Sequence, residues 1–255
     1  VNDDSPDAWK KLIEHLLGLP QYGERWGRHW LDVVRFAQTN GYERDDEKPL
    51  AWKYRDYVIR AFNQDKPYNR FVLEQIAGDE LPDVDNDSLI ATGFYRLGVW
   101  DDEPDDKRLA EFDGLDDIVK TTSETFMGLT VGCARCHDHM FDPVSQQDYY
   151  EMLSFFRNVR YYDKPKFEWD SATYSPLISP KDVFKWQNQK NKQKDAKPPW
   201  HGKEFAMTVR EHGPTTKDTH LLIRGNAGRP SAKVEPEFLK VLAKKKPIIP
   251  RSPNP

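Results

Sequence analysis

The chain has 255 residues, of which 31% are charged and 13% aromatic, and its formal net charge is −4. This near-balance of charge gives no reason to expect a nucleic acid or an anionic membrane as partner, because those surfaces attract strongly basic proteins. No apolar run approaches the roughly twenty residues that a membrane-spanning helix needs. The length suits one or two domains with a substantial core.

Apolar periodicity predicts four helices in the first third of the chain. Ser5 as N-cap and Pro6 at the first helical position start one helix, and Gly18 with Pro20 ends it. The four helices are expected at about residues 5–17, 24–37, 51–62 and 68–77.

The middle of the chain alternates between acidic loops and helices. Residues 79–106 are acidic and turn-rich, which predicts solvated loops. A calcium-binding loop is the alternative, since carboxylates suit a hard cation, although the spacing matches no EF-hand. A long helix is expected at about 112–130. Ser145 and Asp148 then resemble a capping box that opens a helix ending near Arg157.

Beyond residue 160 the helical periodicity fades. We expect a helical domain at 1–160 and an irregular extension at 161–255, with a short β-hairpin and a proline-rich linker. Within the extension, the sequence indicates an aromatic loop at 161–180, an exposed polar stretch at 181–197, strands at 205–211 and 219–224 around the Gly213-Pro214 turn, and the linker at 247–255.

The segment Cys133-Ala134-Arg135-Cys136-His137 contains the two cysteines of the chain. The CxxCH spacing is the attachment signature of a c-type haem. Each thiol can add to one vinyl group of the porphyrin, and His137 then becomes the proximal iron ligand. A zinc site with His139 as fourth ligand has suitable atoms, but ligands so close in sequence rarely close a tetrahedron. A redox dithiol would need a strand–loop–helix context, whereas a long helix precedes this motif.

The second axial ligand of the iron must approach from the face opposite His137. Short tethers disfavour Met140 and His139 for that place. His29 is the preferred candidate, because it lies on a helix between two tryptophans and could be held in an apolar wall over the iron. The weaker candidates are Met127, His212 and His220, and an empty sixth position stays open.

Two further groups of residues have candidate roles. Haem propionates need cationic donors, and a guanidinium fork matches a carboxylate; the candidates are Arg28, Arg35 and Arg135. Exposed aromatic residues in the extension could stack on sugar rings, which would make the chain a glycan-binding module with a structural haem. These aromatic residues are Trp169, Tyr174, Trp186 and Trp200.

Several blocks of the sequence resemble the planctomycete cytochrome c domain family. Residues 22–32 (YGERWGRHWLD) are similar to its opening signature, and 54–58, 77–81 and 132–143 are similar to its recurring blocks. Residues 219–226 resemble the start of the module that usually follows. The resemblance implies a monohaem c-type domain within large exported proteins, often encoded near sulfatases and polysaccharide-degrading systems. In that family the position of Met140 is usually lysine, and that of His29 regularly histidine.

We therefore expect a mainly α fold: a helical monohaem c-type cytochrome domain with a small β element in its C-terminal extension. It should differ from small cytochromes c, since 132 residues precede Cys133. The expected function is electron transfer through one covalent haem, held by His137 and His29, to a redox partner protein or a neighbouring domain of the same polypeptide.

The alternative is a haem enzyme, peroxidase-like or glycan-oxidising, with an open or displaceable sixth site. His29 would then serve as its acid–base group, with Asp32 or Arg35 as helper. Thioether attachment normally takes place outside the cytoplasm, and the chain begins at Val1 without a methionine. Both points favour a piece of a longer, exported protein that is periplasmic or associated with the cell envelope.

Overall fold

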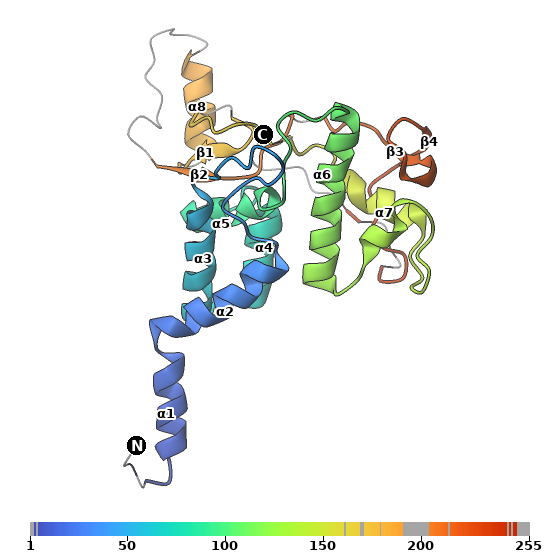
Figure 1. Cartoon of the computed structure of the whole chain (residues 1–255). Coiled ribbons are helices and arrows are strands. Elements are labelled where there is room, and N and C mark those ends of the chain that lie inside the picture. Colours follow the sequence, from blue (N-terminus) through green and yellow to red (C-terminus); the bar gives the residue numbers. More distant parts are fainter. Residues whose placement is uncertain are drawn as a thin grey trace.

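The computed structural model describes residues 3, 5–160, 162–168, 171–178, 180–190, 204–213, 215–243, 245 and 247–248. Helices dominate the described part, and two short antiparallel sheets accompany them. Helices α2 to α5 form one group, α6 stands beside them, and α7 lies on the far side of α6 (Figure 1). The predicted mainly α fold with a small β element is confirmed.

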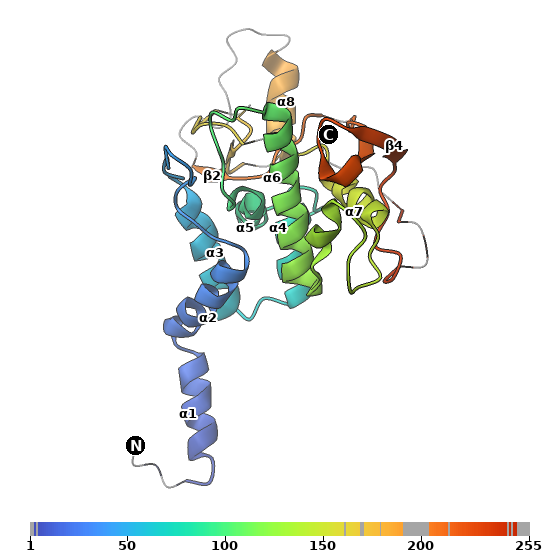
Figure 2. The ribbon, with the colours of Figure 1, turned by 45° about the vertical axis from the view of Figure 1, so that its right-hand side comes forward.

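Helix α1 (Ala8–Leu17) projects away from the rest of the molecule in both views (Figures 1 and 2). It begins after Asp7, two residues later than the predicted Ser5–Pro6 start, and it ends at Gly18 as predicted. The structure describes every residue of α1, and none of them is buried. The apolar face of this helix therefore faces solvent instead of a core.

Helix α2 (Pro20–Val33) packs against α3 (Ala51–Asn63) through its glycines. A Cβ atom at Gly23 would lie 2.4 Å from the carbonyl oxygen of Ile59, so only glycine permits this approach. The predicted span 24–37 was displaced, because Pro20 occupies the first turn and Arg35 turns left-handed at φ 54°. Because the glycine face of α2 is buried, Trp26 and Val33 are exposed.

An aromatic core joins α3 to α4 (Tyr68–Ala77), both of which match their predicted spans closely. Tyr57 and Phe71 stack with ring centroids 5.8 Å apart. The hydroxyl of buried Tyr54 donates to the side-chain oxygen of Gln75, and the indole N–H of Trp30 reaches the same oxygen at 3.1 Å. These bonds satisfy the polar atoms that the aromatic residues carry into the core.

The acidic segment 79–106 contains helical structure that the loop prediction missed. Helix α5 (Asn86–Ala91) starts with a capping box between Asp85 and Ser88, and a 3₁₀ turn (Thr92–Arg96) continues it. All five residues of that turn are buried. Helix α5 is too short to show a clear apolar period in the sequence. A helix of this length is stabilised by packing against neighbouring elements and not by its intrinsic propensity.

Buried Arg96 connects the helical body to the extension. Its guanidinium donates to the carbonyl oxygens of Arg160 at 2.8 Å, Ala172 at 2.6 Å and Thr208 at 3.1 Å. Burial lowers the pKa of Arg96 to about 10, which still leaves it charged at neutral pH. Three carbonyl acceptors therefore compensate one buried cation.

Helix α6 (Lys107–Thr122) begins five residues before its predicted start, because the Asp106 carboxylate accepts the backbone N–H groups of Arg108 and Leu109. A π-helical turn (Ser123–Met127) follows it. Helix α7 (Gln146–Leu153) opens with the predicted capping box of Ser145 and Asp148, which is confirmed, and a 3₁₀ turn (Ser154–Phe156) extends it.

The two predicted strands exist in shortened form, but they do not form a hairpin with each other. Strand β2 (Phe205–Met207) pairs with β1 (Tyr174–Pro176), which precedes it, and β3 (Thr219–Leu222) pairs with β4 (Pro230–Val234), which follows it. Alternating polarity in a sequence predicts a strand but does not show which other strand it pairs with. Pro214 of the predicted turn, residues 191–203 and most of the proline-rich end lie outside the described residues.

Two of the four aromatic residues proposed for sugar stacking are buried, although they were expected to be exposed. Tyr174 is buried in β1 and packs on Phe167, and Trp186 of α8 (Pro180–Lys190) is also buried. The expectation that these two are exposed was wrong, because loop-like sequence around an aromatic residue does not reveal what covers it. Trp169 and Trp200 lie outside the described residues.

Candidate functional site

The end of α6 delivers the chain into the CxxCH motif. After the π turn, Gly128 adopts a left-handed conformation with φ 66°, and a 3₁₀ turn (Val131–Arg135) carries Cys133. Cys136 follows directly. Both thiols are free and exposed. One short turn therefore presents two unoxidised thiols to the surface, as a group attached through both sulfurs requires.

The carbonyl of Arg135, between the cysteines, is held from α7. It accepts hydrogen bonds from the Gln146 side-chain amide at 2.8 Å and from the Tyr150 hydroxyl at 3.0 Å. The Gln146 amide also donates to the carbonyl of Leu222 at 3.0 Å. One side chain thus connects the motif to β3, and the motif has little freedom to rearrange.

His137 is oriented by its own backbone neighbour. Its Nδ1 atom lies 2.7 Å from the carbonyl oxygen of Asp138, so Nδ1–H donates and Nε2 is left as the basic nitrogen. The imidazole is exposed. Metal-binding histidines commonly donate their second ring N–H to a carbonyl in this way, which fixes the tautomer that can coordinate.

Asp138 has a second role at the start of α7. Its carboxylate accepts the backbone N–H of Gln146 at 2.8 Å, in addition to the cap that Ser145 provides. The residue that orients His137 is therefore itself anchored to a helix N-terminus, where a negative charge is stabilised.

His139 has an internal structural role, which argues against the zinc alternative. Its Nδ1 atom accepts the backbone N–H groups of Phe141 at 3.2 Å and Asp142 at 2.8 Å, so Nε2–H donates to the Thr130 hydroxyl at 3.0 Å. Both ring nitrogens are thus engaged. Within the described residues no group of three or more His, Cys, Asp or Glu side chains is arranged to hold a metal ion.

A segment far along the chain forms part of this site. Gly225, with φ 69°, follows β3 and lies so close to the motif that a Cβ atom there would be 2.7 Å from Cys136 Sγ. The same Cβ would be 3.4 Å from the carbonyl oxygen of Arg135. Sequence reasoning placed no functional residue here, because no local pattern shows which distant segment a glycine contacts.

Helix α2 lies at the same end of the molecule as the motif. Arg35, just after α2, pairs with Asp117 of α6, and Trp30 contacts Phe126 of the π turn with centroids 5.8 Å apart. Arg35 follows Trp30 in the sequence, whereas its partner Asp117 precedes Phe126. Helices α2 and α6 therefore run in roughly opposite directions. Figure 1 shows α2 at the same end of the molecule as the C-terminal end of α6, from which the chain continues into the motif.

His29 is exposed on α2, and its ring meets Trp26 edge-on at 5.5 Å. Of the two tryptophans expected to flank His29 in an apolar wall, only Trp26 lies beside its ring at the surface. Trp30 points into the core. A helix places consecutive residues about 100° apart, so His29 cannot share the direction of Trp30. Its imidazole is free to meet a group from solvent.

The three arginines proposed for propionates differ in their surroundings. Arg28 is exposed on α2. Arg35 pairs with Asp117, and Arg135 pairs with Asp113 at 2.6 Å and Asp116 at 3.3 Å. Two of these guanidinium groups therefore already have carboxylate partners in the protein, so Arg28 is the most readily available of the three.

The remaining candidates for the second axial ligand are scattered. Met127 packs against the core, and Met140 is 77% exposed beside the motif. His220 lies in β3, and the backbone N–H of His212 donates to Asn158.

Several carboxylates of the acidic segment 79–106 are engaged in ion pairs. Asp83 pairs with Arg70 at 2.9 Å, Asp87 with Arg60 at 2.6 Å, and Asp102 with Lys164 at 2.9 Å. The alternative of a calcium-binding loop therefore stays a prediction, without an assembled set of ligands in the described part.

Comparison with known proteins gives one match. No curated protein and no solved structure matches the chain. In the described part of the chain, no helix is both long and apolar enough to cross a bilayer. A family model described as PSCyt2, a protein of unknown function (DUF1549), matches residues 1–161, which include α1 to α7 and the CxxCH motif but not β3 or Gly225. The chain belongs to this planctomycete-associated family.

Proposed function

We propose that the chain is a c-type cytochrome domain that carries one covalent haem and transfers electrons. The observation that carries the proposal is the arrangement of three groups within five consecutive residues. Cys133 and Cys136 present free, exposed thiols, and His137 presents Nε2 while Nδ1 is bonded to the Asp138 carbonyl. These are the donor types and the tautomer that haem c attachment and axial ligation require.

The surroundings of the motif support the same proposal. Large apolar side chains are exposed on α2 and just after the motif, where Met140 is 77% and Phe141 88% exposed. On α2 the exposed residues are Trp26 and Val33, on either side of His29. Exposed large apolar side chains can mark a site that something else covers, and a porphyrin face is apolar. We propose that these residues line the haem.

His29 is the proposed second axial ligand. Its imidazole is exposed, its ring is braced by Trp26, and α2 lies at the end of the molecule where the motif emerges. The bound haem supplies one-electron exchange between ferrous and ferric iron. Two histidine ligands would leave no open position for dioxygen or peroxide, so electron transfer is favoured over oxidative catalysis.

The haem-enzyme alternative receives less support from the local contacts. Of the two helpers considered for an acid–base His29, Arg35 is paired with Asp117 at 2.8 Å, whereas Asp32 is exposed. The electron acceptor or donor is proposed to be a partner protein or a neighbouring domain of the same polypeptide. Because thioether attachment takes place outside the cytoplasm, the proposed location is the periplasm or cell envelope.

The test is expression of the 255-residue chain in a host that exports it and matures haem c. Mass spectrometry of the denatured protein should show one haem bound covalently, and Cys133→Ala and Cys136→Ala should each remove one thioether. A protein that folds, as judged by circular dichroism, but retains no covalent haem under these conditions contradicts the proposal.

The ligand assignment has its own test in the optical spectrum. The ferric protein should be low-spin, and His29→Ala should convert it to high-spin or shift its spectrum strongly. His15→Ala is the matched control, since His15 is also an exposed helical histidine but lies on α1. An unchanged low-spin spectrum in His29→Ala rejects His29, and high-spin wild-type haem that binds cyanide readily rejects the pure electron-transfer function.

A further inference from the structure

Two adjoining cavities, lined by no residue of the CxxCH motif, lie between the loop at residues 40–46, the loop at 98–106 and the start of α6. Their volumes are about 320 Å³ and about 380 Å³. Tyr42, Trp100, Asp101 and Asp105 line both. We call them the apolar lobe and the acidic lobe of one cleft.

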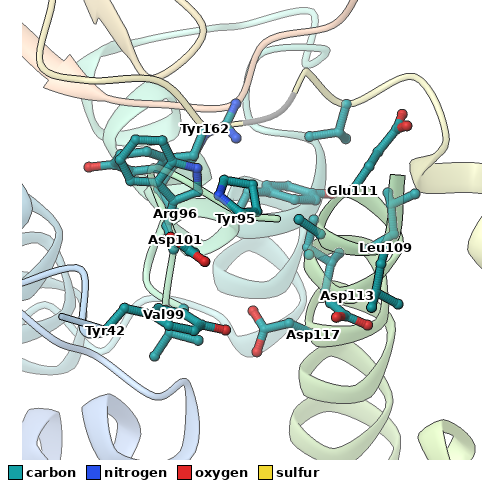
Figure 3. A pocket seen from close by; sticks show the side chains of 18 of the residues that line it. Tyr42, Tyr95, Arg96, Val99, Asp101, Leu109, Glu111, Asp113, Asp117 and Tyr162 are labelled. Carbon is teal, nitrogen blue, oxygen red and sulfur yellow. The ribbon is translucent and has the colours of Figure 1, made fainter. Parts of the chain in front are cut away.

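The apolar lobe has hydrocarbon and aromatic walls. Figure 3 shows Tyr42 and Val99 on one side of it and Leu109 and Asp117 of α6 on the other. Tyr42, Val99 and Leu109 are all exposed large apolar side chains, with Val99 at 68%. Six carboxylates also line it, of which Asp117 pairs with Arg35, Asp113 with Arg135 and Glu111 with Arg157. The lobe therefore suits the uncharged body of a ligand.

The acidic lobe has the opposite character. Among the described residues that line it are seven carboxylates and one cation, Arg44, which is paired with Glu103 and lies 3.5 Å from Asp102. Hydrogen bonds from Thr39 and from the Gly41 backbone lower the pKa of Asp45, so that carboxylate stays ionised. A cleft with this excess of negative charge concentrates cations near it.

A buried amide in the acidic lobe provides an independent sign of a ligand. Asn40 lines this lobe and is only 2% exposed, and neither its side-chain nitrogen nor its side-chain oxygen has a hydrogen-bond partner among the described residues. Its backbone is fixed, since its N–H donates to Asp46 and its carbonyl accepts from Trp100, each at 2.9 Å. A buried donor and acceptor left unbonded are costly, and native proteins rarely keep them so.

We propose that this cleft binds a small organic cation, an ammonium group carried on an apolar or aromatic body. The ammonium would lie beside Asp101 and Asp105, the two carboxylates that both lobes share. The body would lie in the apolar lobe against Tyr42 and Trp100, whose ring faces attract a cation and whose edges pack on hydrocarbon. The proposal does not depend on the haem.

The test uses three probes of the same shape and different charge on the whole chain: 2-phenylethylammonium, neutral 2-phenylethanol and anionic 3-phenylpropanoate. Titration calorimetry and saturation-transfer NMR should detect the ammonium, with the alcohol about tenfold weaker and the carboxylate undetected. Raising the salt concentration should weaken the ammonium alone. Equal binding of all three probes, or none by the ammonium at millimolar concentration, overturns the proposal.

Substitutions test whether the ammonium probe binds in the proposed cleft. Asp101→Asn and Tyr42→Ala, both changes at partly or largely exposed positions, should each weaken 2-phenylethylammonium about tenfold. Asp83→Asn is the matched control, because Asp83 is an acidic loop residue that pairs with Arg70 and does not line the cleft. Unchanged affinity in both Asp101→Asn and Tyr42→Ala, or displacement of the amine by equimolar calcium chloride, contradicts the assignment.

Discussion

Gly225 and Cys136 are in direct contact although 89 positions separate them: a Cβ atom at Gly225 would be 2.7 Å from the Cys136 sulfur. The glycine has φ 69°, in the left-handed region that residues with a side chain rarely adopt. The family match ends at residue 161, so this contact adds a segment from outside the matched region to the candidate site. The contact leads to the first prediction.

Gly225→Ala should displace Cys136 and reduce thioether formation at that cysteine, while Cys133 stays competent. The measurement is the fraction of protein with one and with two thioethers, by mass spectrometry. Independently of haem, the apo protein should show a changed rate of Cys136 alkylation. Gly128→Ala is a close control, because Gly128 has φ 66° but no described atom within 4 Å of a Cβ there. Equal effects of both changes would assign the result to backbone strain alone.

Gln146→Leu should destabilise the motif and β3 together. The amide of Gln146 donates to the carbonyls of Arg135 and Leu222, and the substitution leaves one bond of each missing. We expect the free energy of unfolding to fall by about 1–3 kcal/mol in urea denaturation. Gln147→Leu, at an exposed neighbour bonded only to Glu151 in the described structure, should change it by less than about 0.5 kcal/mol. A smaller loss for Gln146→Leu than for Gln147→Leu contradicts the linking role.

Arg96→Met should be among the most damaging single changes in the chain. The guanidinium is buried and its three carbonyl partners come from Arg160, Ala172 and Thr208, so its loss leaves three acceptors without this donor. The expected loss is about 3–5 kcal/mol of unfolding free energy, or failure to accumulate folded protein. Arg60→Met is the control, since Arg60 is exposed and, among the described residues, forms an ion pair with Asp87 only. Arg96→Lys, which folds more readily, should show a partial loss by thermal unfolding.

Stability should fall as the pH rises through 7 because of Asp79. Burial and the nearby Glu80 carboxylate raise the pKa of Asp79 from 3.8 to about 7, so the folded state holds its proton more tightly than the unfolded state. The stabilisation is complete below pH 3.8 and is lost as the pH passes 7. Asp79→Asn should therefore remove about 1–3 kcal/mol of the difference between pH 5 and pH 8.

The control for that pH dependence is Asp83→Asn. The hydrogen bond from Arg70 lowers the pKa of Asp83, so this substitution should not flatten the profile between pH 5 and pH 8. Glu211 also has a raised pKa, chiefly through burial, and a residual slope of the same sign should persist in Asp79→Asn. A profile that Asp79→Asn leaves unchanged would mean that the carboxyl is ionised in the fold.

Local patterns in the sequence were sufficient for several elements. Helices α3 and α4 match the predictions within about a residue, and the Ser145–Asp148 cap is present as predicted. The CxxCH motif was likewise found from its spacing alone. In each case the determining contacts lie within four residues along the chain, as helical periodicity and capping require.

Elements that depend on distant partners were predicted less well. The sequence indicated strands near 205 and 219, but their partners are β1 and β4, which lie on opposite sides of them in sequence. Helical periodicity likewise did not show that the glycine face of α2 packs on α3 and leaves Trp26 and Val33 exposed. Helix α5 was missed because six residues are too few for a periodic signal.

The sequence by itself therefore determined which reactive groups the candidate site has: two thiols and a histidine within five residues, with helices before and after them. Only the tertiary structure decided which groups surround that chemistry. It brought Gly225 onto Cys136, turned His29 to the surface beside Trp26, and left the Asn40 amide unpaired in an acidic cleft. Such contacts join residues far apart in sequence, and they form because packing must bury the apolar core and compensate its polar groups, which no local pattern specifies.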